Sequence, residues 1–228
     1  MADRLTSGEF AARHELPDWR IILQGIETWF VAPSFVDAVR FIGEIAELAE
    51  AADHHPDLDL RYRRLHIRLS SHDANGLTDR DGALAAQISE RAAALGISAE
   101  PEASARLEVA IDVLDVDAVR PFWRAALGYD EDPPYDGDQV SYQGKVIGLH
   151  DPGGIGPAFW FQQMDAPRRQ RNRIHIDIDV PHDEVDDRIQ AVLAAGGTMV
   201  NDAYARAFWV LADPEGNEAC LCTWEDRG

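Results

Sequence analysis

Two similar segments in the second half of the chain restrict its fold more than any other feature. Residues 106–113 read RLEVAIDV and residues 173–180 read RIHIDIDV, and both alternate apolar and polar side chains as a half-buried strand does. A helical stretch follows each segment, at 117–127 and at 183–195, and each stretch ends at a glycine before further short strands. This repeat predicts two copies of one βαβββ module.

The segment 96–105, GISAEPEASA, separates the repeat from the first half of the chain. It combines Gly, Pro and small polar residues without apolar periodicity, which is typical of a linker. A chain of 228 residues is long enough for two domains that each bury a core. We therefore predict one domain over residues 1–97 and a second over residues 104–228.

The first half predicts an α+β domain with the element order ββαβα. Strand-forming runs at 19–23 and 26–31 suggest a hairpin, and a stripe of apolar residues then predicts a helix that ends near Asp53. Residues 65–69 alternate Leu and Ile with His and Arg, as a strand with one buried face does. A last helix is expected over 78–96. We expect the helices to pack on an antiparallel sheet.

Charge and cysteine content argue against several classes of function. The chain has 21 basic and 41 acidic residues, and its formal net charge of -20 repels nucleic acids and anionic membranes. Cys220 and Cys222 lack the distant partners of a disulfide framework or a structural zinc site, so we expect reduced thiols and a cytoplasmic location. We find no pattern of a secretion signal or a membrane span. A small-molecule substrate is the expected partner, with no nucleic acid and no membrane.

Histidines and acidic residues are concentrated between residues 49 and 81. An acidic residue and three spacers precede a His-His-Pro triplet, and an aromatic residue, a third histidine and an aspartate follow. These residues are Glu50, His54, His55, Pro56, Tyr62, His72 and Asp81. The set resembles the signature of the pterin-4a-carbinolamine (4a-hydroxytetrahydrobiopterin) dehydratases, and the expected element order agrees with that family over about residues 10–96.

The resemblance implies catalysis by histidine. Loss of hydroxide from C4a of a 4a-hydroxytetrahydropterin needs an acid for the oxygen and a base for the N5 proton, and imidazole, with a pKa of about 6.5, serves both roles. By resemblance, His54 and His72 are the acid–base pair and His55 helps to hold the pterin. Glu50, Asp81 and Tyr62 are then substrate-binding or supporting residues. Neither a cofactor nor a metal is required for this dehydration.

Structural roles compete with some of these assignments. Thr78 and Asp81 have nearly the spacing of a capping box, which explains Asp81 equally well as part of a helix start. The His-His-Pro triplet could cap a helix end, and Glu50 could be a solvated charge on a helix face. Tyr62 and His66 could line the polar face of the sheet, and for His66 we favour that structural role.

The second half resembles the vicinal oxygen chelate superfamily, which includes glyoxalases, extradiol dioxygenases and fosfomycin-resistance proteins. The resemblance covers about residues 106–224. It depends on FWRAALGY at 122–129, NRIHIDIDV at 172–180 and ADPEGNE at 212–218. It implies the paired βαβββ fold more strongly than any one activity.

Active members of that superfamily hold a divalent metal on the first and last strands of each module. Superposing the two repeats makes Glu108 and His175 the candidate ligands. Cys220 stands where relatives carry a chelating Glu, with Gln162 as its apparent counterpart in the first module, and thiolate does not suit a hard metal. We therefore expect no metal, with His175 as a strand histidine and Glu108 as a polar pocket residue.

These features together predict a hydro-lyase that converts a 4a-hydroxytetrahydropterin into a quinonoid dihydropterin, fused to a domain that binds a small molecule. The alternative hypothesis is a metal-dependent enzyme of glyoxalase or dioxygenase type. In that case the N-terminal domain is a non-catalytic module for pterin binding or dimerisation. The dehydratase resemblance also implies a homodimer or homotetramer.

Overall fold

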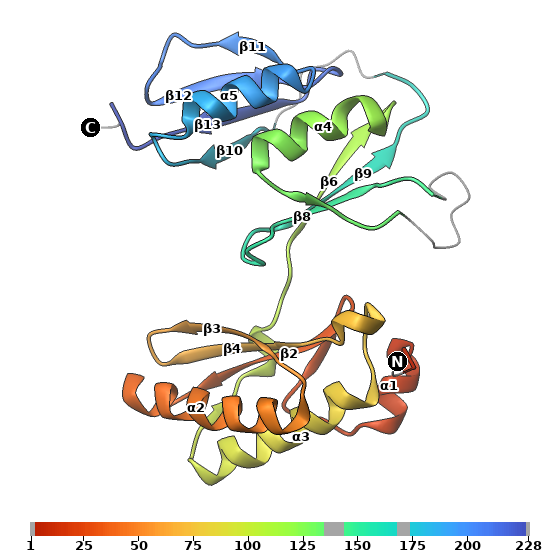
Figure 1. The fold of residues 1–228 in the computed structure, drawn as a ribbon, viewed down its shortest axis with the longest axis vertical. Coiled ribbons are helices and arrows are strands. Elements are labelled where there is room, and N and C mark those ends of the chain that lie inside the picture. The colour runs from red at the N-terminus through yellow and green to blue at the C-terminus, as the bar shows by residue number, and fades with distance from the viewer. Residues whose placement is uncertain (1–2, 135–143, 168–173, 227–228) are drawn as a thin grey trace. The chain divides into compact units, whose positions relative to one another are not determined.

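The computed structural model of the chain describes residues 3–134, 144–167 and 174–226 (Figure 1). The chain divides into two compact units, Met1–Arg106 and Leu107–Gly228. The first unit extends past residue 97, where we placed the end of the first domain. Part of the expected linker forms secondary structure there, because strand β5 (Ser98–Ala99) pairs with strand β2 (Gly25–Val31) and the 3-10 helix η2 (Pro101–Ala103) follows.

The sheet of the first unit has the strand order β1-β2-β4-β3, with β5 paired to β2. Its other strands are β1 (Arg20–Ile22), β3 (Asp57–Arg61) and β4 (Arg64–Leu69), and every pairing is antiparallel. β3 and β4 form a hairpin, because only two residues separate them. The alternation in β4 has the expected result, since Leu65, Ile67 and Leu69 are buried in the core.

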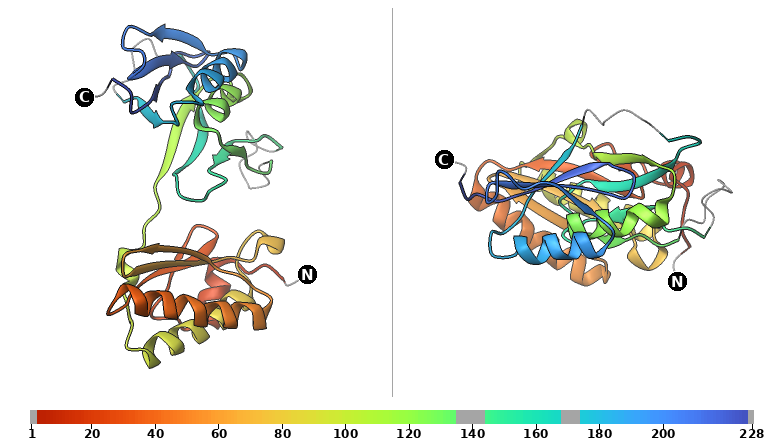
Figure 2. Two further views of the ribbon diagram at one scale, coloured as in Figure 1. Left: turned by 60° about the vertical axis from the view of Figure 1, so that its left-hand side comes forward. Right: turned by 90° about the horizontal axis from the view of Figure 1, so that it is seen from above.

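Three helices complete the first unit: α1 (Ser7–Arg13), α2 (Phe35–Ala52) and α3 (Asp79–Ala94). In Figure 1 and in the left view of Figure 2, α2 and α3 lie on the same side of the sheet. Helix α2 ends at Asp53, whose left-handed backbone (φ 46°) turns the chain out of the helix directly before His54. The predicted ββαβα order on an antiparallel sheet is confirmed, and α1, β3 and β5 are additional elements.

The second unit contains two βαβββ modules, which confirms the prediction made from the repeat. The first module comprises β6 (Glu108–Val113), α4 (Val116–Leu127), β7 (Asp130–Glu131), β8 (Gly148–His150) and β9 (Ala158–Gln163). The second comprises β10 (Ile176–Asp179), α5 (Val185–Ala194), β11 (Thr198–Asn201), β12 (Phe208–Ala212) and β13 (Glu218–Cys222). Their sheets have equivalent orders, β6-β9-β8-β7 and β10-β13-β12-β11, and in each sheet the first and last strands of the module are parallel. Arg173, at the start of the second repeat, lies outside the described residues.

Polar contacts connect the two modules through the ADPEGNE segment. Asp213 is buried, and its carboxylate accepts a hydrogen bond from Nε1 of Trp123 in α4 (3.0 Å). The Glu215 carboxylate accepts from the backbone N–H groups of Leu114 and Asp115, just before α4 begins. The side chains of both modules also share one apolar core. The segment therefore has a structural role.

Among the described residues, no helix is both long enough and apolar enough to cross a bilayer.

Candidate active site

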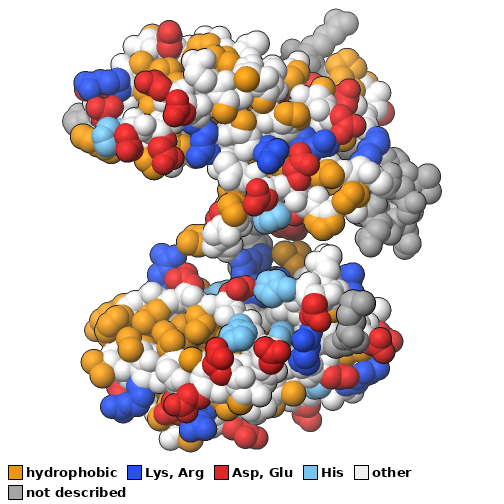
Figure 3. All heavy atoms as spheres, viewed as in Figure 1, with side chains coloured by type: hydrophobic (Ala, Val, Ile, Leu, Met, Phe, Trp, Pro, Cys, Tyr) orange, Lys and Arg blue, Asp and Glu red, His pale blue; other side chains and the backbone are white. Residues whose placement is uncertain are grey.

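The three predicted catalytic histidines lie on two segments that meet at one end of the β3–β4 hairpin. His54 and His55 come between the end of α2 and the start of β3, and His72 comes just after the end of β4. Asp57, the first residue of β3, faces Arg68 near the end of β4, so both segments leave the same end of this strand pair. Figure 3 shows that histidine side chains gather on one face of the first unit beside acidic side chains.

His54 forms a buried pair with Asp81. His54 is 6% exposed, Asp81 is fully buried, and Nε2 of the histidine lies 2.8 Å from Oδ1 of the carboxylate. The other oxygen, Oδ2, accepts from the backbone N–H of Thr78 (2.7 Å) and from the hydroxyl of Ser71 (2.8 Å). Because Asp81 acts as an acceptor toward these groups, we assign the proton of the neutral His54 ring to Nε2. Nδ1 is then the ring nitrogen that can gain and lose a proton.

Asp81 also belongs to the start of helix α3. Thr78 is the N-cap residue, and its backbone N–H is bonded to the Asp81 side chain in a capping box. The sequence allows two roles for Asp81, a helix cap and a partner of the site histidines. Each role involves a different oxygen of the one carboxylate. Oδ2 caps the helix and Oδ1 contacts His54. Through Asp81, the helix start holds the histidine ring in one orientation.

His55 and His72 are more accessible than His54. Nε2 of His55 lies 3.0 Å from Oε1 of Glu50, which is in the last turn of α2, and both side chains are exposed. His72 is exposed and begins the short 3-10 helix η1 (His72–Ala74). The next residue, Asp73, is bonded to Arg80 of α3, and this hydrogen bond holds the pKa of Asp73 below its ordinary value. The contact connects the turn that carries His72 to α3.

Tyr62 is not brought together with the histidines. It is 75% exposed and lies in the turn between β3 and β4 with a left-handed backbone (φ 55°). The five residues of β3 separate this turn from the end where the histidines lie, a distance of about 16 Å at 3.3 Å per residue. Tyr62 lies far from the histidines because the residues after His-His-Pro form strand β3, which the sequence analysis did not predict.

His66 takes part in a different network, in the middle of β4. Its Nε2 lies 2.6 Å from Oε2 of Glu27, which is 1% exposed and also accepts from Nε of Arg106 at 3.3 Å. Burial raises the pKa of Glu27, but the hydrogen bond with His66 and the charge of Arg106 outweigh it, so the pKa lies below its ordinary value. This contact matches the structural role that we favoured for His66.

Two families match the chain, one in each unit. Residues 3–91 match the family described as Pterin 4 alpha carbinolamine dehydratase, and residues 108–222 match the family described as Glyoxalase-like domain. A protein of Chloroflexus aurantiacus named "Putative pterin-4-alpha-carbinolamine dehydratase" is 46% identical over 88 residues, which cover 38% of this chain and 95% of that protein. The chain belongs to both families.

Solved structures similar to each domain are also known. A transcriptional coactivator/pterin dehydratase from Brucella melitensis shares 32% identity with a TM-score of 0.38, covering 40% of this chain and 99% of that one. A glyoxalase/bleomycin resistance protein/dioxygenase family enzyme from Burkholderia phytofirmans shares 21% identity with a TM-score of 0.39, covering 51% of this chain and 95% of that one.

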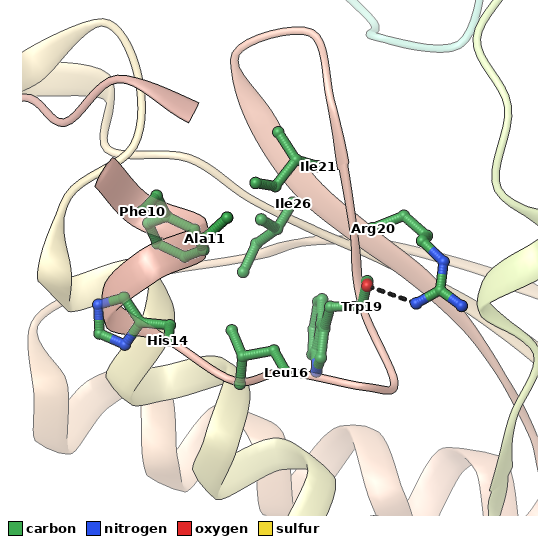
Figure 4. Close-up of a pocket in the computed structure, with 8 residues that line it drawn as sticks. All are labelled: Phe10, Ala11, His14, Leu16, Trp19, Arg20, Ile21 and Ile26. Carbon is green, nitrogen blue, oxygen red and sulfur yellow. Dashed lines mark hydrogen bonds between the residues drawn. The ribbon is translucent and has the colours of Figure 1, made fainter. Parts of the chain in front are cut away.

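A pocket of about 270 Å³ in the dehydratase domain lies apart from the predicted site residues (Figure 4). Eight residues line it: Phe10, Ala11, His14, Leu16, Trp19, Arg20, Ile21 and Ile26. Its polar groups already have protein partners, because His14 is bonded to Asp79, Trp19 donates to Ser89 and Arg20 donates to backbone carbonyls. The predicted catalytic histidines do not line this pocket, so it is not the candidate site.

In the glyoxalase-like domain, the candidate metal ligands differ from those we predicted. Within the described ranges, donor atoms of His175, Asp177 and Cys220 all lie within 4.8 Å of one another. Nε2 of His175 is 3.3 Å from Oδ1 of Asp177, and Asp177 faces Cys220 across the β10–β13 pair. Glu108 does not belong to this group. Burial, followed by the charge of Asp177, raises the pKa of the Cys220 thiol to about 12.

The strand register also corrects one equivalence between the modules. Ala110 is the counterpart of Asp177 in the aligned repeats, and it pairs with Trp160 across β6 and β9. Trp160, and not Gln162, is therefore the counterpart of Cys220. The His, Asp and Cys donors lie within one module, and their nitrogen, oxygen and sulfur atoms fit zinc better than a hard cation.

Sequence reasoning missed two residues at these sites, and each had a detectable signal. Ser71 has the same parity as Leu65, Ile67 and Leu69, so a polar side chain continues the buried row of β4. Asp177 is the second residue of β10 and lies two residues after His175, which directly precedes the strand, so the period-2 spacing indicates one side of the chain for both side chains. Its proximity to Cys220 depends on the register of β10 with β13, which local patterns do not specify.

Proposed function

We propose that the first unit dehydrates a 4a-hydroxytetrahydropterin, such as 4a-hydroxytetrahydrobiopterin, to the quinonoid dihydropterin. The observation that supports this most directly is the buried His54–Asp81 pair, placed beside the strand end that carries His72. One histidine is held in a fixed orientation and another is accessible. An oriented histidine and an accessible one are compatible with proton transfer at two atoms of one bicyclic substrate.

In the proposed reaction, a protonated histidine donates its proton to the C4a hydroxyl, which leaves as water when the C4a–O bond breaks. A neutral histidine takes the proton from N5, and the electron pair of the N–H bond forms the C4a=N5 double bond. One proton is delivered and one is removed, so no electron donor or acceptor is needed. His54 and His72 fill the two roles in an order that we leave open, and exchange of protons with water restores the pair.

The other site residues bind the substrate or support this pair. The exposed His55, bonded to Glu50, would contact the pterin ring, while Asp81 keeps His54 in orientation. No cofactor takes part in the dehydration. We further propose a cytoplasmic enzyme that assembles as a homodimer or homotetramer, as the dehydratase resemblance implies.

Turnover of a synthetic 4a-carbinolamine by the full-length protein tests this function. His54→Ala and His72→Ala should each lower kcat/KM by about 10²-fold or more, the usual contribution of a general acid or base. His182→Ala, which removes an exposed histidine of the second unit, serves as the control and should retain the wild-type rate. An inactive wild type, or full activity in either site variant, would contradict the proposal.

The His175, Asp177 and Cys220 group supports a second candidate function, a metal-dependent reaction in the glyoxalase-like domain. The first unit would then be a pterin-binding or dimerisation module. Zinc, when bound, supplies Lewis-acid polarisation of a coordinated oxygen. These three side chains would bind the ion. Calorimetric titration with zinc should show one site that Cys220→Ser weakens, with Cys222→Ser as the control, and the absence of zinc binding would exclude this function.

A further inference from the structure

Ser71 places a hydroxyl where the pattern of β4 calls for an apolar side chain. Its side chain follows the row of Leu65, Ile67 and Leu69, and it is 0% exposed. A hydroxyl removed from water destabilises the fold unless it finds hydrogen-bond partners. Ser71 finds two, because its Oγ lies 2.8 Å from Oδ2 of Asp81 and 2.8 Å from Oγ1 of Thr78.

The backbone of Ser71 closes the turn that carries His72. Its N–H donates to the carbonyl of Gly76 at 2.8 Å, and its own carbonyl accepts from the N–H groups of Ala74 (3.1 Å) and Gly76 (3.3 Å). His72 is the residue that follows Ser71 in this turn. A displacement of Ser71 would therefore move the backbone on which His72 is carried.

We propose that Ser71 is a positioning residue that fixes the spacing between His54 and His72, an inference that rests on the proposed dehydratase function. The Ser71 hydroxyl binds Oδ2 of the carboxylate whose Oδ1 binds His54. One buried group thus connects the turn after β4 with the segment after α2. Ser71 does not need to touch the pterin for this role, because it acts through Asp81 and through the turn.

Ser71→Ala tests the proposal in the full-length protein, with Ser70→Ala as a matched control. Ser70 is also buried, but its hydroxyl accepts from Arg68 and does not contact Asp81. A displacement of about 1 Å at a catalytic group costs up to about 10²-fold in rate, so Ser71→Ala should lower kcat by about 10- to 100-fold with little change in KM. Ser70→Ala should keep kcat within about twofold of the wild type.

A conservative variant separates positioning from a general loss of packing. Ser71→Thr keeps the hydroxyl, so its kcat should be close to the wild-type value and well above that of Ser71→Ala. If Ser71 had a purely structural role, kcat would instead follow thermal stability across Ser71→Ala, Ser71→Thr and Ser70→Ala. If Ser71→Ala does not fold, Ser71→Cys, whose thiol is a weaker donor, should show an intermediate kcat. Wild-type kcat in Ser71→Ala or Ser71→Cys, or equal losses in Ser70→Ala and Ser71→Ala, would overturn the proposal. An inactive wild type would instead refute the dehydratase function.

Discussion

Replacing Asp81 by Asn exchanges one of two buried acceptor oxygens for a donor amide. If the amide nitrogen takes the place of Oδ2, it faces the N–H of Thr78, and if it takes the place of Oδ1, it faces Nε2 of His54. A buried donor without a partner costs about 1–3 kcal/mol. His54 can avoid this cost by moving its proton to Nδ1, but Thr78 cannot move its backbone hydrogen. We therefore expect the amide nitrogen to face His54.

Two measurements on Asp81→Asn should then give effects of different size. The free energy of unfolding of the first unit should fall by only about 1 kcal/mol, because the helix cap survives. The kcat for dehydration should fall by about 10²-fold or more whichever role His54 has. Its Nδ1 already carries the ring proton and its Nε2 faces the donor amide, so the ring can neither accept a proton as a base nor hold a second one as an acid. Urea denaturation and a dehydration assay at saturating substrate measure the two quantities.

The matched control is Glu9→Gln in the capping box of α1, where the Glu9 side chain accepts from the backbone N–H of Thr6 at 2.9 Å. That variant changes cap chemistry in the same domain without touching a catalytic histidine, so kcat should not change. If Asp81→Asn keeps kcat within about threefold of the wild type, Asp81 is only a helix cap and the orientation of His54 does not matter for catalysis.

Three further predictions concern other polar contacts. Glu27→Gln should destabilise the first unit by about 1–3 kcal/mol at pH 7. Because the folded pKa of Glu27 lies below its ordinary 4.5, the stabilisation by Glu27 is complete above pH 4.5 and is lost as the pH falls through the folded pKa. The urea unfolding curves of variant and wild type should therefore converge in acid, and a stability difference that does not change with pH would contradict this. Asp213→Ala should leave Nε1 of Trp123 unpaired and lower the free energy of unfolding of the second unit by about 1–3 kcal/mol in calorimetry, and an unchanged transition would refute the structural role of ADPEGNE. Glu50→Gln should raise KM for the pterin by at most about fivefold, because an exposed pair contributes no more than about 1 kcal/mol, and a loss confined to kcat would show that Glu50 has a different role.

Much of the fold was predictable because its strands and helices carry regular patterns. The alternation of residues 65–69 predicts a strand with one buried face, and the repeat at 106–113 and 173–180 predicts the paired modules. β3 was missed because it is a short edge strand whose Leu58 stays partly exposed. β5 was missed because it exists only through pairing with β2, a contact distant in sequence.

The candidate site was predictable where spacing along the chain determines it. His54 and Asp81 are 27 residues apart, yet both lie next to helix ends that local patterns identify. Tyr62 was grouped with them because motif order does not reveal that a strand carries it to the far end of the hairpin. The contact of Asp177 with Cys220 depends on strand register, which is set by packing across the whole sheet.

A double-mutant cycle in dehydration of a 4a-carbinolamine tests most directly whether His54 and His72 act together on one substrate. kcat/KM would be measured for the wild type, His54→Ala, His72→Ala and the double variant under identical conditions. Groups that act as a unit are not additive, so each single variant should lose nearly as much as the double variant. Fully additive losses would show that the histidines act independently, and wild-type rates in the single variants would show that neither is catalytic.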